Sequence, residues 1–287
     1  MSELNDVSVL ISGQVLTSRT ETIEDYLAPR VARLGVIGIA GPFQKGAQAR
    51  VTEYREGRKA AERQRPSVHV ANRHSLPGIF LLVAAFANYV WTIVRGAYLM
   101  KGSFDLFIGV SCFSAFVGLL LRLLGKVERV VYYSIDYYPR PPRRGFNRVM
   151  VWAFRRVDRF TARRADLVWH ITPRIAEARR EFARLPPDRY RHIHVPLCYR
   201  QSMCRNVPLE DVERWTLGFV GTLTESQGVQ LAIEALPRIA ERIPDIRLRI
   251  VGQGPHSEQL RELARKSGCE ERIVFHGFVR DEEEMLN

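Results

Sequence analysis

Short apolar runs alternate with amphipathic runs along most of this chain. Each apolar run has the length of one strand, and each amphipathic run has the three- and four-residue spacing of a helix. This alternation is typical of a parallel sheet covered by helices, so the sequence predicts an α/β fold. In the first two thirds of the chain the predicted strands are Val7–Ile11, Val36–Ala40, Ser67–Ala71, Leu106–Val110, Arg129–Asp136, Ala165–Ile171 and Arg191–Val195.

Three helices with defined ends are predicted between these strands. One covers Thr22–Leu34, with Thr22 as its N-cap. A second follows a turn at Ser111 and ends at Leu124, and a third starts at Thr172-Pro173, where proline is favoured, and ends at Leu185. The polar stretch 42–66 permits either a hairpin turning at Glu56-Gly57 or a surface helix.

The most hydrophobic segment is Ile79–Val94. It is shorter than the roughly 20 residues that a bilayer span needs, and Asn88 interrupts it. Three interpretations stay open: a buried helix that covers the sheet, a helix partly embedded in a membrane surface, or a transmembrane span.

A second kind of pattern occupies Trp215–Ala235. A buried strand is predicted over Trp215–Val220, followed by a turn at Gly221, a polar loop, and a helix that begins near Gln227. Such a unit directs backbone N–H groups and a helix N-terminus to one point, which suits a phosphate or diphosphate. An ordinary strand-to-helix turn without a ligand is the alternative.

Three motifs in this part of the chain follow one another at a family's spacing: GFVGTLTESQGVQLAIEAL, LRIVGQGPHSEQL and RIVFHGFV. Together they resemble the first half of the nucleotide-sugar domain of glycosyltransferase family 4, the group 1 glycosyltransferases. The resemblance implies a GT-B fold of two Rossmann-like domains. It also implies transfer of a sugar from a nucleotide diphosphate sugar, usually with retention, without a cofactor or a metal. We expect an acceptor-side domain over residues 1–200, a linker over 201–214, and a partial donor domain over 215–287.

The resemblance also implies the residues of the donor site, with two departures from the family pattern. Thr222 and Gln227 stand where the family usually has an arginine and a lysine that contact the diphosphate. A hydroxyl and an amide cannot neutralise phosphate charge, so we expect weaker stabilisation of the leaving group. The implied donor-binding residues are Gly221, Thr222, Gln227, Gly228, Gly252, Gly254 and His276, with His276 in a loop after a strand over Ile273–Phe275.

On the acceptor side, Asp136 ends a predicted strand, where ligands of open α/β sheets gather. It is the candidate catalytic residue, with capping of the next loop as the alternative. Ile135 stands where many family members have a histidine. The loop Ser12, Gly13 and Gln14 is a candidate acceptor or phosphate loop, with a plain connection as the alternative. The family's paired glutamates lie beyond the third motif, so we expect residues 1–287 alone to transfer sugar poorly or not at all.

Composition adds one feature to this picture, a net charge of +12 from 43 lysines and arginines against 31 acids. This positive charge indicates an anionic partner. The sequence contains no motif typical of nucleic-acid-binding proteins, so we do not expect nucleic acid to be that partner. Basic residues concentrate beside an apolar helical stripe that starts at Phe146. They could contact an anionic membrane or lipid, or form a solvated face. The arginines of this cluster are Arg140, Arg143, Arg144, Arg148, Arg155, Arg156, Arg159, Arg163 and Arg164.

The remaining features bear on location and on an alternative function. Cys112, Cys198, Cys204 and Cys269 form no C-x-x-C pair, so we expect reduced cysteines and no zinc site. The N-terminus lacks the pattern of a signal peptide. We therefore expect a cytoplasmic protein, peripheral on the inner face of the cell membrane, that acts on a cell-surface glycan or a lipid-linked acceptor. The alternative is a non-catalytic module, derived from a glycosyltransferase, that binds a membrane or a partner.

Overall fold

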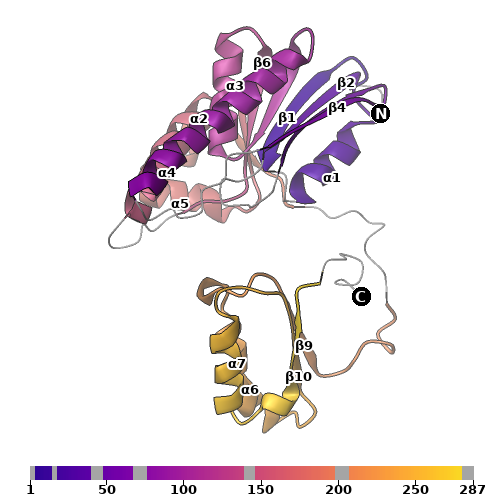
Figure 1. The fold of residues 1–287 in the computed structure, drawn as a ribbon, viewed down its shortest axis with the longest axis vertical. Coiled ribbons are helices and arrows are strands. Elements are labelled where there is room, and N and C mark those ends of the chain that lie inside the picture. Colours follow the sequence, from indigo (N-terminus) through magenta and orange to yellow (C-terminus); the bar gives the residue numbers. More distant parts are fainter. Residues whose placement is uncertain are drawn as a thin grey trace. The chain divides into compact units, whose positions relative to one another are not determined.

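The chain forms two compact α/β units, residues 1–198 and 199–287. The computed structural model describes residues 4–14, 18–39, 48–66, 76–138, 146–197 and 207–279. Each unit has its own sheet and its own buried core. The two units are therefore described separately below (Figure 1).

The N-terminal unit is built on an eight-stranded sheet with the order β4-β3-β2-β1-β5-β6-β7-β8. Six strands, β2, β1, β5, β6, β7 and β8, run parallel. Strands β3 and β4 extend the sheet beyond β2 as an antiparallel hairpin. Most of the predicted strands are present, with shifted ends. The bounds are β1 (Ser8–Gln14), β2 (Arg33–Ile39), β3 (Gln48–Arg55), β4 (Arg58–Pro66), β5 (Phe104–Val110), β6 (Val127–Ser134), β7 (Leu167–His170) and β8 (His192–His194).

The hairpin decides between the two interpretations of residues 42–66, at least over the part from residue 48 onward. Strands β3 and β4 pair there, and Glu56 and Gly57 form the turn. Both turn residues have positive φ values, 50° and 76°, as a two-residue hairpin turn requires. The surface-helix alternative is therefore wrong.

Helices cover both faces of this sheet (Figure 1). On one face α2, α3, α4 and α5 enclose a core that includes Ile93, Val117 and Ala162. On the other face α1 packs against β1 and β2, around Ile11 and Leu34. The helix bounds are α1 (Ser18–Leu27), α2 (Leu76–Leu99), α3 (Cys112–Leu123), α4 (Phe146–Arg164) and α5 (Arg174–Ala183).

Two predicted boundaries near the N-terminus are wrong. Helix α1 ends at Leu27 instead of Leu34, and Thr22 lies inside it rather than at its N-cap. Pro29 follows closely, and a proline cannot continue a helix because it lacks the N–H and crowds the preceding turn. The chain therefore enters β2 at Arg33, three residues earlier than predicted. The predicted strand Ser67–Ala71 lies outside the described residues.

Helix α2 contains the most hydrophobic segment and is buried over only part of its surface. Ile93 and Ala97 are fully buried against the sheet, whereas Val83 and Trp91 are 66% and 57% exposed. Helix α2 thus covers the sheet through one side, as the interpretation as a buried helix expected, while Val83 and Trp91 stay exposed in the part of the chain that the structure describes. Within the described part of the chain, no helix combines the length and the apolar character needed to cross a bilayer.

The C-terminal unit has a three-stranded parallel sheet with the order β11-β10-β9. Helices α6 (Val229–Ala240) and α7 (Ser257–Lys266) pack on it through a core that includes Ile233, Leu248 and Leu260. The strands are β9 (Thr216–Val220), β10 (Arg247–Val251) and β11 (Ile273–Gly277).

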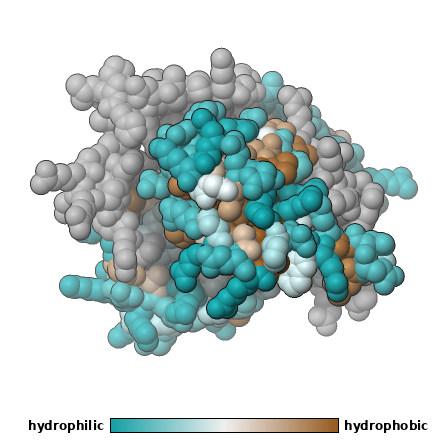
Figure 2. All heavy atoms as spheres, turned by 90° about the horizontal axis from the view of Figure 1, so that it is seen from below, coloured by the Kyte–Doolittle hydropathy of each residue, from teal (hydrophilic) through white to brown (hydrophobic). Residues whose placement is uncertain are grey.

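The prediction of a buried strand at β9 is wrong. Leu217 is 41% and Val220 is 51% exposed, and β9 is an edge strand among the described residues. Apolar sequence marks β9 as a strand but does not reveal that it lies at an edge. The surface seen in Figure 2 is mostly hydrophilic, with apolar residues in small separate patches.

Candidate functional site

Two glycine turns are pressed together at the carboxyl edge of the C-terminal sheet, and we call them the paired glycine turns: one at Gly221 and one at Gly252–Gly254. A Cβ atom at Gly252 would lie 1.8 Å from the carbonyl oxygen of Gly221. A Cβ atom at Gly254 would lie 2.1 Å from the carbonyl oxygen of Leu223. Only glycine permits both approaches, so the sequence at these positions fixes how closely the two loops meet.

The first turn leads into α6 through a second left-handed glycine. Residues Glu225–Gln227 form a 3₁₀ turn, and Gly228, at φ 77°, both ends that turn and precedes the first residue of α6. Helix α6 thus begins two residues later than predicted. Thr222 and Gln227 are exposed on this loop, where their side chains are available to a ligand.

The third motif brings His276 to the same edge of the sheet, but not in a loop. His276 lies inside β11, which extends to Gly277, and its side chain is exposed. The backbone N–H of Gly252 donates to the carbonyl oxygen of Gly277 at 2.7 Å and so ties β11 to the second glycine turn. The expectation of a loop at His276 is therefore corrected, because this hydrogen bond extends the pairing of β11 with β10.

In the N-terminal unit, the sheet reverses its strand order between β1 and β5, which is where open α/β sheets bind ligands. Ser12, Gly13 and Gln14, predicted as a loop, are the last residues of β1. Ser12 is fully buried, and its Oγ has no hydrogen-bond partner among the described residues. Ser111 caps α3 at the end of β5 with φ 106°, a strained value for a residue with a side chain.

Asp136 lines a cavity of about 290 Å³ at the carboxyl ends of β6 and β7. It is exposed and lies two residues beyond the end of β6, which begins and ends two residues earlier than predicted. Ile135 and Thr172 also line this cavity, as does Arg174, whose guanidinium pairs with Glu177 at 2.7 Å. A carboxylate and a hydroxyl beside one small cavity can accept hydrogen bonds from a polyhydroxylated ligand.

A buried ion pair beneath this edge was not predicted from the sequence. Arg179 of α5 and Asp158 of α4 are both fully buried, and Arg179 Nε donates to Asp158 Oδ2 at 2.8 Å. Tyr132 donates to Asp158 Oδ1 at 2.6 Å, and Arg179 Nη2 donates to Ser134 Oγ at 2.9 Å. Burial alone would lower the pKa of Arg179, but Tyr132 and Asp158 raise it above its usual range.

The signal for this ion pair was present in the sequence. Asp158 stands four residues after Phe154, so it falls on the apolar side of α4 rather than among the exposed arginines. An acid in an apolar stripe needs a buried cation, because an unpaired buried charge is costly. Which of the many arginines would pair with it depends on the packing of α5.

His170 completes the network, and its pKa makes stability depend on pH. Arg179 Nη1 lies 3.2 Å from His170 Nδ1, and Tyr190 Oη lies 3.2 Å from Nε2. Burial, together with the charge of Arg179, lowers the pKa of His170 from 6.5 to about 3. The imidazole is therefore neutral when folded and accepts a hydrogen bond from Arg179.

We expect the N-terminal unit to lose stability as the pH falls below about 6.5. The unfolded chain protonates His170 in that range and the folded chain does not, so the unfolded state gains the protons. The free energy of unfolding should drop by about 1 kcal/mol between pH 7 and 5.5. Urea unfolding at both pH values measures this. His170→Asn should reduce the drop, whereas His276→Gln, at an exposed histidine, should leave it unchanged.

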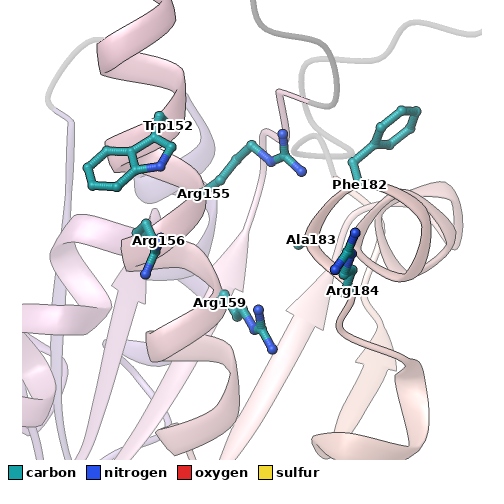
Figure 3. Close-up of a pocket in the computed structure, with 7 residues that line it drawn as sticks. All are labelled: Trp152, Arg155, Arg156, Arg159, Phe182, Ala183 and Arg184. Carbon is teal, nitrogen blue, oxygen red and sulfur yellow. The ribbon is translucent and has the colours of Figure 1, made fainter.

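The arginine cluster is only partly described. Arg140, Arg143 and Arg144 lie outside the described residues, and Arg148 belongs to α4. Arg155 and Arg156 line a second cavity between α4 and α5 (Figure 3). Among the described residues, no group of three or more His, Cys, Asp and Glu side chains could hold a metal ion.

Comparisons with known proteins fit this geometry. The family model described as "Glycosyl transferases group 1" matches residues 203–287, which include the paired glycine turns. Alpha-D-kanosaminyltransferase of Streptomyces kanamyceticus is 26% identical over 240 residues, which are 76% of this chain and 62% of that protein. The chain therefore spans less than two thirds of the length of this relative.

Solved structures resemble both units at low sequence identity. Sucrose-phosphate synthase of Thermosynechococcus elongatus superposes with a TM-score of 0.65 at 15% identity, covering 98% of this chain and 72% of that one. HepE of Anabaena, solved in complex with UDP, superposes with a TM-score of 0.58 at 18% identity. The match covers 97% of this chain and 71% of HepE. Residues 203–287 thus match the model of the group 1 glycosyl transferases, and the chain has the α/β architecture of the GT-B fold.

Proposed function

We propose that the protein of which this chain is part transfers a sugar from a nucleotide diphosphate sugar to a glycan or a lipid-linked acceptor. The observation that carries the proposal is the contact between the paired glycine turns, within the region that matches the family model. The first turn leads to exposed Thr222 and Gln227 and to the N-terminus of α6, where a diphosphate would bind. The relative HepE, solved with UDP, supports the same ligand class.

The proposed reaction needs no metal and no further cofactor from this chain. The N-terminus of α6, which has no side-chain cap, would stabilise the charge that develops on the departing diphosphate. Asp136 would orient an acceptor hydroxyl from its cavity. We propose retention at the anomeric carbon, as the family resemblance implies. Nuclear magnetic resonance of the product, made by the full-length protein, would show the anomeric configuration; an inverted product would refute this part.

We also propose that the N-terminal unit works at the inner face of the cell membrane, on the cytoplasmic side. Two observations support this. Helix α4 exposes Trp152 beside Arg156, and α2 exposes Phe86 and Trp91. Aromatic side chains favour the lipid interface, and each arginine near an anionic surface contributes about 1 kcal/mol. Flotation with vesicles of phosphatidylcholine and increasing fractions of phosphatidylglycerol tests this. Binding that does not increase with the fraction of phosphatidylglycerol would contradict the proposal.

A non-catalytic binding module is the second candidate, because specific residues favour it. Thr222, Gln227 and Ile135 replace charged or ionisable residues of the family pattern. Calorimetry with UDP- and GDP-sugars separates the two proposals. Saturable binding supports the transferase, and its absence, together with retained vesicle flotation, supports the module.

Restoring the family's cations should strengthen diphosphate binding. Thr222 and Gln227 are exposed, so Thr222→Arg and Gln227→Lys should fold normally. Each new charge-assisted hydrogen bond to a phosphate should tighten UDP binding about tenfold. Calorimetric titration measures the change. The matched control is Ser226→Lys, an exposed position on the same loop, which should change affinity little; equal gains from all three variants would mean that only net charge matters.

A further inference from the structure

A cavity of about 380 Å³ lies between α4 and the end of α5, and we call it the arginine cavity. Figure 3 shows Arg155 and Arg159 extending from α4 toward α5, with Arg184 at the end of α5. Trp152, which is 58% exposed, and Phe182 supply aromatic surface to the same cavity. The guanidinium of Arg156 lies 5.1 Å from the ring centroid of Trp152.

Among the described residues, no acid balances the charge of this cavity. The described residues that line it include four arginines and no acid. None of these four arginines makes an ion pair with an acid in the part of the chain that the structure describes. The neighbouring acid, Asp158, is already held by Arg179 and Tyr132. The C-terminus of α5 contributes only about half of a negative charge, which the arginines outweigh.

A buried ion pair holds together the two helices that form the walls of the cavity. The ion pair joins α4 to α5 through Asp158, which is next to the lining residue Arg159, and Arg179, which is four residues before the lining residue Ala183. Arg184 takes the left-handed conformation that ends α5, and its backbone N–H donates to the carbonyl oxygen of Arg179. The cationic side chains therefore project from a rigid frame, which lowers the entropic cost of binding an anion.

We propose that the arginine cavity binds a phosphoryl group carrying two or more negative charges, either a phosphomonoester or a diphosphate. Guanidinium forks match phosphate oxygens in pairs, and a single carboxylate would leave most of the charge uncompensated. The aromatic side chains can pack against the apolar part of such a ligand. The inference rests on the N-terminal unit alone and does not depend on sugar transfer. The ligand is either a lipid headgroup or a free phosphorylated compound.

The test is a titration with inorganic diphosphate that follows the fluorescence of Trp152, which lines the arginine cavity and belongs to the N-terminal unit rather than to the unit of the paired glycine turns. Arg156→Gln/Arg159→Gln should weaken binding at least about tenfold, since two charge-assisted contacts are lost. The control pair, Arg58→Gln/Arg129→Gln, removes the same charge at exposed positions outside the cavity and should have little effect. Trp152→Phe should remove the fluorescence change, and circular dichroism checks that each variant folds.

Vesicles then identify the source of the phosphate. Stronger competition by vesicles that contain phosphatidic acid than by phosphatidylglycerol vesicles of equal charge would identify a lipid headgroup. Competition by neither would identify a free phosphorylated compound, and either result supports the site. Three results would overturn the proposed site: equal competition by both kinds of vesicle, an equal loss of diphosphate affinity in the cavity variant and the control variant, or the absence of saturable binding. UDP binding at the paired glycine turns should stay unchanged throughout, so failure here is distinct from failure of the proposed transferase.

Discussion

Arg179→Met is expected to destabilise the N-terminal unit by about 3–5 kcal/mol. The change leaves the Asp158 carboxylate fully buried with Tyr132 as its remaining hydrogen-bond donor. It also removes the hydrogen bonds that Arg179 donates to Ser134 and His170. Chemical denaturation followed by circular dichroism would measure the loss.

Two further variants make this prediction specific. Arg180→Met changes the next residue of α5, which is exposed, and should alter the free energy of unfolding by less than about 0.5 kcal/mol. Arg179→Met/Asp158→Leu removes both charges and should be more stable than Arg179→Met alone, because no charge is left unpaired. If Arg179→Met and Arg180→Met behave alike, the buried ion pair does not hold α4 and α5 together.

Gly252→Ala should disrupt the paired glycine turns and abolish binding of UDP. The new Cβ would lie 1.8 Å from the carbonyl oxygen of Gly221, and the backbone at φ 141° disfavours any side chain. Overlap and strain together should cost about 2–5 kcal/mol, so the two turns must separate. Calorimetry with UDP measures the loss of binding, and thermal unfolding measures the loss of stability.

The matched control for this variant is Gly218→Ala in β9. A Cβ atom there would meet nothing within 4 Å, and its φ is not positive. We therefore expect near-normal stability and unchanged UDP binding. Retained UDP binding in Gly252→Ala would contradict the role of the paired glycine turns, whereas equal losses in both variants would indicate a general sensitivity of the unit to alanine.

The paired glycine turns show where sequence reasoning succeeds and where it stops. The motifs around Gly221 and Gly252 are recognisable because each glycine follows a strand-length apolar run. That Gly252 presses on Gly221 is a contact across a parallel sheet, which no local pattern encodes. His276 illustrates the same limit, because a hydrogen bond from a distant turn extends β11 through that residue.

The sequence by itself determined the α/β class, the order of most elements and the glycine turns, because periodicity and turn chemistry are local properties. Only the tertiary structure decided that β9 is an exposed edge strand, that residues from 48 to 66 pair as a hairpin, and that Arg179 is the partner of Asp158. It also decided that four of the many arginines share one cavity. Burial, pairing and unbalanced charge depend on neighbours in space, and a one-dimensional pattern does not specify those neighbours.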